Sequence, residues 1–171
     1  MKIIIEKYNP KWKIYFEIEK GILIIALAEI SYKIEHIGST SVKGLGAKPV
    51  IDIMIGLEDF SLANKVIPKI EKLGYIYVSK YEDVMPYRRF FTKDTKGTRT
   101  HHIHMVEIKT DFWKRHLLFR DHLRKNKTDR GKYFLLKKEL SSHKWENTDK
   151  YSNAKTSFIK SIESKASKAI K

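Results

Sequence analysis

Apolar residues recur with two different periods along this chain, and each period predicts one kind of element. Alternation and short β-branched runs are typical of strands, whereas apolar residues three or four positions apart are typical of helices. Strands are predicted at about 34–37, 50–55, 75–78, 87–92 and 99–108, and helices at about 10–30, 62–73, 111–123, 130–142 and 149–162. The pattern therefore predicts an α+β protein, with a mixed β-sheet flanked by helices and a helical C-terminal region.

The strand predicted at 50–55 carries a carboxylate, Asp52, among apolar neighbours. A buried charge is costly unless it is paired or binds a metal, so Asp52 needs a partner. One interpretation makes Asp52 a metal ligand or a general base. The other makes it the structural ion-pair partner of Lys48, His102 or His104. Alternation puts His102 and His104 on one face of their strand, where two imidazoles can bind one metal ion if the two strands pair.

A run of small residues, Gly38-Ser39-Thr40-Ser41, follows the first core strand. Backbone N–H groups and hydroxyls in such a tight turn can hold the oxygen atoms of a phosphate. The alternative is a plain turn that caps a helix, because Ser and Thr favour that position. The sequence lacks the Gly-Lys-Ser/Thr ending of a P-loop, and Gly44-Leu45-Gly46 has no third glycine and no helix start after it.

Length and composition set the outer limits of the prediction. The chain has 171 residues, of which 42% are hydrophobic, and this suits one domain over residues 1–171. Its sheet core is expected at about 1–108 and its helices at about 109–171. Cysteine is absent, which excludes a disulfide framework and a cysteine-based zinc site. No apolar run resembles a signal peptide or a membrane span, so a cytoplasmic location and no membrane partner are expected.

Positive charge is concentrated in the C-terminal region. The formal net charge is +15, and the segment from Lys109 onward contains 18 Lys and Arg but only 7 Asp and Glu. Such a region can attract nucleic acid, nucleotides or other acidic partners. The alternative is a lysine-rich surface that serves solubility alone.

Six short motifs are spread along the chain: Glu35–Ser41 with Gly44-Leu45, Ala47–Ile53, Tyr87–Phe91, Thr100–His104, Phe119–Arg124 and Lys155–Ile159. Together they resemble the GrpB family, which belongs to the polymerase-beta-like nucleotidyltransferase superfamily and also occurs fused to dephospho-CoA kinase. Because the motifs run from Glu35 to Ile159, the resemblance extends over nearly the whole chain. The resemblance implies a nucleotidyltransferase-like fold.

The resemblance also implies a reaction and a cofactor. Superfamily members place Gly-Ser after one strand, two acids at alternate positions on the next strand, and a third acid on a later strand around Mg²⁺ or Mn²⁺. Gly38-Ser39 and Asp52 match the first parts of this pattern. Met54 stands where the second acid is expected, and His104 is expected to take the place of the third. This departure makes transfer with two metal ions doubtful.

Further site residues follow from the same motifs. Glu35 is a candidate catalytic carboxylate, and its alternative role is an ion pair at the rim. Arg88, Arg89 and Lys155 are candidate phosphate binders, as is Lys48. Adjacent residues of a strand point to opposite faces, and Arg89 is preferred to Arg88.

Four functions are therefore considered. The first is metal-dependent transfer of a nucleotidyl group from a nucleotide to a small-molecule acceptor. The second is a noncatalytic module that binds a nucleotide or another ligand, and the third is a nucleic-acid-binding protein that uses the basic helices. The fourth is hydrolysis at a histidine-rich metal centre, although the second His-x-Thr/Ser motif of two-histidine phosphoesterases is missing.

Overall fold

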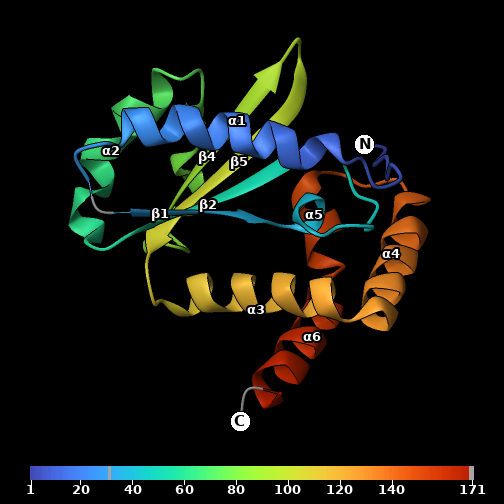
Figure 1. Cartoon of the computed structure of the whole chain (residues 1–171). Coiled ribbons are helices and arrows are strands. Elements are labelled where there is room, and N and C mark those ends of the chain that lie inside the picture. The colour runs from blue at the N-terminus through green and yellow to red at the C-terminus, as the bar shows by residue number, and fades with distance from the viewer. Residues whose placement is uncertain (31, 170–171) are drawn as a thin grey trace.

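A five-stranded mixed sheet lies at the centre of the computed structural model, which describes residues 1–30 and 32–169 (Figure 1). The strand order is β1-β2-β5-β4-β3. β2 and β5 run parallel in the middle, and the other three pairs are antiparallel. The strands are β1 (Tyr32–Ile37), β2 (Ile51–Leu57), β3 (Ile76–Tyr77), β4 (Arg88–Thr95) and β5 (Thr98–Glu107). The predicted α+β class with a mixed sheet is confirmed.

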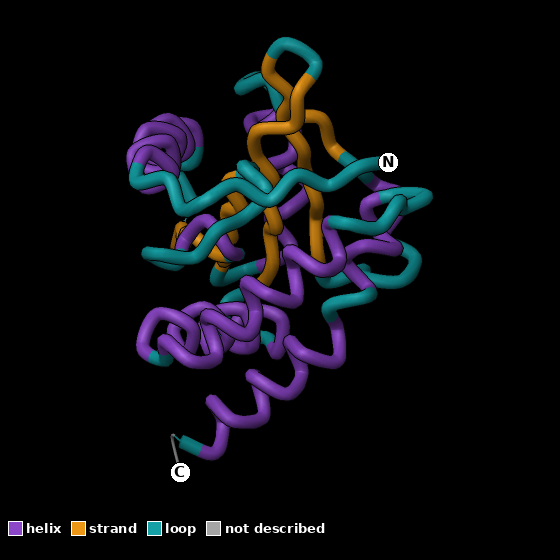
Figure 2. Tube along the Cα trace, turned by 90° about the vertical axis from the view of Figure 1, so that its right-hand side faces the viewer, coloured by secondary structure: helices purple, strands orange, loops and turns teal. Residues whose placement is uncertain are grey.

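Helices cover both faces of this sheet and also build the C-terminal region. α1 and α2 pack on one face, and α3 packs on the other (Figure 1). α6 runs away from the sheet towards the C-terminus (Figure 2). The helices are α1 (Lys11–Ala26), α2 (Ala63–Glu71), α3 (Asp111–Lys125), α4 (Lys127–Ser141), α5 (Thr148–Asn153) and α6 (Thr156–Lys168). Across the described residues, none of these helices has the length and apolar character that a membrane crossing requires.

The sheet separates two clusters of buried side chains. On the first face, the alternating isoleucines of β2, such as Ile53, pack with Trp12 and Phe16 of α1. On the second face, Met54 and Val106 pack against α3. β2 is thus apolar on both faces, as expected for a strand in the middle of a sheet. The second face is the one that carries Asp52.

Two helix boundaries differ from the prediction. The helix expected at about 10–30 ends at Ala26. The helix expected at 149–162 is two helices, because the chain bends at Ala154 and Lys155. At the bend, the Lys155 ammonium lies 4.3 Å from the centroid of the Tyr151 ring. The apolar spacing of the sequence does not reveal this break between two helices.

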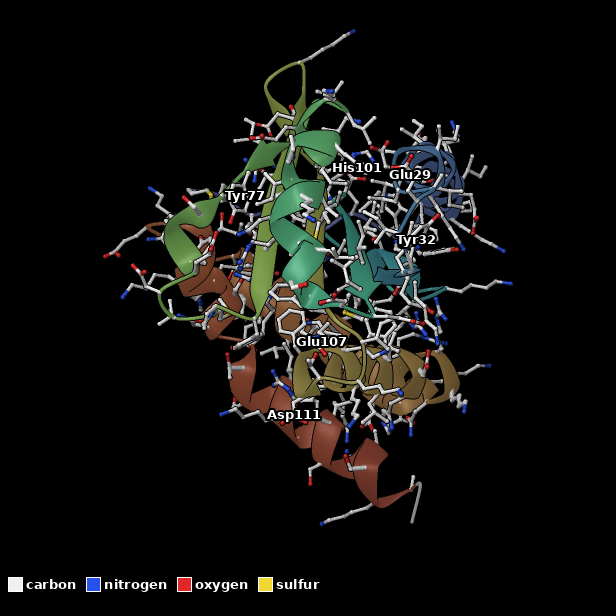
Figure 3. All side chains as sticks on the ribbon, turned by 90° about the vertical axis from the view of Figure 1, so that its left-hand side faces the viewer. Glu29, Tyr32, Tyr77, His101, Glu107 and Asp111 are labelled. Atoms are coloured by element: carbon white, nitrogen blue, oxygen red, sulfur yellow. The ribbon has the colours of Figure 1, made fainter. Side chains whose placement is uncertain are left out.

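The connection from β5 to α3 fixes the helix under the second face. Figure 3 marks its two ends, Glu107 and Asp111. Thr110 caps α3: its hydroxyl accepts a hydrogen bond from the Trp113 N–H at 3.4 Å and donates one to the Glu107 carbonyl at 2.8 Å. Side-chain capping of this kind satisfies N–H groups that have no partner within the helix.

A lysine of α4 is buried beneath the turn region. The Lys137 side chain is 2% exposed, and its ammonium donates to the Gly46 carbonyl and lies 4.8 Å from the centroid of the Tyr133 ring. Burial, together with the charge of Lys155, lowers the pKa of Lys137 to about 7. The fold therefore favours the neutral amine.

This burial predicts that stability rises with pH. Between about pH 7 and the pKa of 10.5 in the unfolded chain, the unfolded state holds a proton on Lys137 that the folded state lacks. The free energy of unfolding should therefore increase over this range, by at most about 1.4 kcal/mol per pH unit for this one proton. Urea unfolding at several pH values between 6 and 9.5 measures this increase in the free energy of unfolding. Lys137→Met should remove this increment, whereas Lys138→Met, at the exposed neighbouring position, should keep it. Equal pH dependence in the two variants would contradict the prediction.

Candidate functional site

The candidate site forms where β2 and β5 pair. In the parallel register, Asp52 lies opposite His102, and Met54 lies opposite His104. Side chains of a strand alternate between faces, so Asp52, His102 and His104 share the face that packs against α3. The two strands do pair, which was the condition for their side chains to converge, and the pairing brings a carboxylate and two imidazoles together.

The three side chains are close enough to bind one ion. One potential ligand atom from each lies within 4.8 Å of the others. The Asp52 Oδ1 accepts a hydrogen bond from the His102 Nδ1 at 2.9 Å. Burial raises the pKa of Asp52, but the hydrogen bond and charge of His102 outweigh it and hold the pKa below its usual value. Asp52 is therefore an ionised carboxylate.

His104 lies deeper, in an aromatic and cationic environment. Its Nδ1 is 3.2 Å from the Arg88 Nη1, and its ring centroid lies 5.0 Å from that of Phe90 and 5.9 Å from that of Phe112. Burial holds the pKa of His104 well below its ordinary value, and the charge of Arg88 adds to this effect. His104 is therefore a neutral imidazole with one lone pair.

The Gly38–Ser41 turn lies directly against Asp52. Gly38 has a φ of 69°, and a Cβ atom added there would overlap the Asp52 Oδ2. Two of the turn's hydroxyls hold the turn itself. Thr40 donates to the Val50 carbonyl at 3.1 Å, and Ser41 donates to the Gly38 carbonyl at 2.6 Å. The Ser41 N–H also donates to the Gly38 carbonyl, at 3.3 Å, so the N–H groups of Ser39 and Thr40 and the half-buried Ser39 hydroxyl are the turn's donors for a ligand.

Two lysines from distant parts of the chain are influenced by the charge of the Asp52 carboxylate. Burial lowers the pKa of Lys48, and the attraction of Asp52 opposes this shift. Burial likewise lowers the pKa of Lys155 to about 8, again against the attraction of Asp52. Both ammonium groups thus experience the Asp52 charge, although one lies before β2 and the other at the start of α6.

The two arginines lie on opposite faces of the sheet, and Arg88, not the preferred Arg89, lies on the face of the candidate site. Arg88 lies on the site face and contacts His104. Arg89 contacts the Asn64 side chain at 3.1 Å and the Glu82 carboxylate at 3.4 Å. Alternation requires this split, but which arginine faces the site depends on the register of β4 on β5.

Glu35 is not brought to the three ligands. Its Oε2 accepts a hydrogen bond from the Arg120 Nη1 at 2.6 Å, so it has the rim ion pair that was its alternative role. It also lies outside the group of residues able to hold an ion. The structure therefore gives Glu35 an ion pair across β1 and α3 in place of a contact with the ligands.

Four residues near the site were missed by the sequence analysis. The Arg99 Nη1 lies 3.5 Å from the His102 Nε2, and the His116 ring centroid is 6.3 Å from that of His104. His116 donates from Nδ1 to a carbonyl of α3, which leaves Nε2 as an acceptor, and burial lowers its pKa to about 4. Arg120 and Arg124 donate to backbone carbonyls at the end of β1 and in the turn. The Phe119–Arg124 motif was visible, but not the carbonyls that its arginines reach.

The donor set can be compared with the expected ion. Asp52 offers oxygen, whereas His102 and His104 offer imidazole nitrogen. Mg²⁺ prefers an octahedron of oxygen ligands, and first-row transition ions accept two imidazoles with one carboxylate. Met54, fully buried, supplies no second carboxylate. The two imidazoles therefore favour a first-row transition ion over Mg²⁺, for which Asp52 alone offers an oxygen ligand.

The sequence matches one family of bacterial proteins over nearly its whole length. A family model described as GrpB protein matches residues 2–165. A UPF0157 protein of Halalkalibacterium halodurans is 34% identical over 164 residues, which cover 96% of this chain and 82% of that protein. The glutamate-rich protein GrpB of Alkalihalophilus pseudofirmus is 32% identical, with 94% of each chain covered.

Solved structures agree with this assignment. The crystal structure of GrpB from Enterococcus faecalis superposes with a TM-score of 0.86 at 37% identity, over 98% of this chain and 99% of that one. A cytoplasmic RNA terminal U-transferase superposes with a TM-score of 0.54 at 12% identity, over 77% of this chain and 40% of that one. The fold is therefore nucleotidyltransferase-like, and the chain belongs to the GrpB family.

Proposed function

We propose that the protein binds a nucleotide together with a divalent metal ion and transfers the nucleotidyl group to a small-molecule acceptor. The observation that carries this proposal is the convergence of Asp52, His102 and His104 against the Gly38–Ser41 turn. The nucleotidyltransferase-like fold supports it. A bound divalent ion would supply positive charge at the phosphates.

The residues around the three ligands have the chemistry that a triphosphate requires. The backbone of the turn and Ser39 offer donors on one side of Asp52. Lys48, Lys155 and Arg88 offer positive charge on the others. Asp52, ionised through its contact with His102, is the group available to hold an ion or to accept a proton from the acceptor.

The proposal is tested by the loss of metal-dependent nucleotide binding in Asp52→Ala. Isothermal titration of a nucleoside triphosphate panel, with Mn²⁺, with Mg²⁺ and without metal, should show binding by the wild type that Mn²⁺ strengthens. Asp52→Ala should weaken that binding at least about tenfold, equivalent to about 1.4 kcal/mol. Asp83→Ala, at an exposed carboxylate, is the matched control and should bind like the wild type. Unchanged binding by Asp52→Ala would refute the assigned role.

A noncatalytic binding module is the second candidate, and one observation favours it. Met54, in place of a second acid, is packed between β1, β5 and α3 in the cluster of Ile37, Val106 and Trp113. A second metal ion therefore has no carboxylate at that position. Nucleotide binding without pyrophosphate release, across a panel of hydroxyl and amine acceptors, would favour the binding module. Pyrophosphate release with any acceptor would favour the enzyme.

A further inference from the structure

Arg88 is a half-buried cation without an acidic side chain in ion-pair contact. Among the described residues, no carboxylate lies within ion-pair distance of its guanidinium, and its Nε is buried without a hydrogen bond. The guanidinium carbon lies 5.5 Å from the centroid of the Tyr81 ring, 5.0 Å from that of Phe90 and 5.8 Å from that of Phe112. Among these aromatic rings, the Arg88 guanidinium makes a hydrogen bond to His104. A guanidinium with free donors and no carboxylate in direct contact is suited to an anion.

The contact between Arg88 and His104 occupies a ring nitrogen of His104 that could otherwise bind a metal ion. A guanidinium only donates hydrogen bonds, so the His104 Nδ1, at 3.2 Å, is the acceptor and carries the lone pair. The proton of this neutral ring is then on Nε2. A metal at Nδ1 would need the position of the Arg88 donor. A metal at Nε2 would move the ring proton to Nδ1, where it would face the Arg88 donors.

Either geometry of metal binding therefore excludes the Arg88 contact. We infer that a metal ion and Arg88 compete for His104, and that metal binding frees the Arg88 guanidinium to bind an anion at the site. In the proposed function, on which the identity of the anion rests, that anion is the phosphate of the nucleotide. Arg88 thus acts as a positioning residue: it holds the side chain of the metal ligand His104 by a hydrogen bond while the metal is absent.

The charges of the site couple the two events. A divalent ion placed at Asp52 adds positive charge near Arg88, Lys48 and Lys155, against one carboxylate. An anion that enters with the freed arginine offsets this repulsion. Metal and phosphate should therefore favour each other's binding, and this coupling is reciprocal.

The decisive test uses Co²⁺ alone, without nucleotide, because its visible absorption reports imidazole coordination directly. Arg88→Met removes the competing donor and should raise the affinity for Co²⁺ about tenfold, the equivalent of one hydrogen bond to a charged group. Arg89→Met removes the same charge from the adjacent residue on the opposite face, and it should change the affinity less than about threefold. Equal effects of the two substitutions, or no Co²⁺ binding by any variant, would overturn the inference.

A second measurement on the wild type does not depend on how well a variant folds. Long-range proton–nitrogen NMR of the metal-free protein should show His104 protonated on Nε2. Zn²⁺ should shift the signal of whichever His104 ring nitrogen binds it, and with it the Arg88 side-chain signals. His104 protonated on Nδ1 before metal is added would overturn the inference. Co²⁺ binding that follows the prediction while every nucleotide fails to bind would refute the proposed function and leave the competition at His104 intact.

Discussion

Gly38→Ala is expected to disrupt the site and destabilise the fold together. The backbone of Gly38, with φ 69° and ψ −174°, lies in a region that is essentially confined to glycine. The new methyl group would also overlap the Asp52 Oδ2. Strain and overlap together should lower the free energy of unfolding by about 3 kcal/mol. Because relief of the overlap moves the carboxylate, the affinity for Co²⁺ should fall as well.

Gly21→Ala is the matched control for this substitution. Gly21 lies within α1, and a Cβ atom there would meet nothing within 4 Å. Alanine favours a helix over glycine by about 1 kcal/mol, so this variant should be slightly more stable than the wild type and bind Co²⁺ unchanged. Urea unfolding and Co²⁺ titration compare the two variants. Wild-type stability in Gly38→Ala would show that the turn relaxes without pressing on Asp52.

Arg120→Met is expected to have the second largest effect. Arg120 is 8% exposed and joins α3 to β1: it donates to Glu35 at 2.6 Å, to Asp121 at 2.7 Å and to the His36 carbonyl at 3.1 Å. Methionine keeps the apolar stem and removes every donor. The two carboxylates are partly exposed and can regain water, so the cost should be about 2–3 kcal/mol, below that of a fully buried pair.

Arg115→Met separates this effect from a general loss of charge. Arg115 is on the same helix, 3.5 Å from Glu163, and its side chain is 46% exposed. Exposed pairs contribute little, so unfolding by urea should show a loss under about 1 kcal/mol. Equal losses in the two variants would mean that the Arg120 contacts do not hold α3 against β1.

The sequence pattern predicted the parts of the site that depend on strand periodicity. A carboxylate in an apolar β-branched run and two histidines at alternate positions were enough to expect Asp52, His102 and His104 on one face. Alternation determines this relation within each strand, and the central pairing of β2 with β5 follows from the burial that both strands need.

Contacts between distant elements could not be predicted in the same way. Glu35 faces α3 and pairs with Arg120, 85 residues later, and no local pattern links the two. The choice between Arg88 and Arg89 depends on the register of β4, and a slip of one residue would reverse it. The break between α5 and α6 at Lys155, where the ammonium lies over the Tyr151 ring, likewise has no signal in the local apolar spacing.

The parallel pairing of β2 with β5 has a consequence for folding. Asp52 and His102 are 50 residues apart in the chain, and Lys155 comes from farther still. Loop closure over such separations must precede any favourable contact at the site. Partly folded chains, in which this pairing is absent, therefore lack the assembled ligand set. An ion held there binds the native state alone, so its binding energy adds to the stability of the complete sheet.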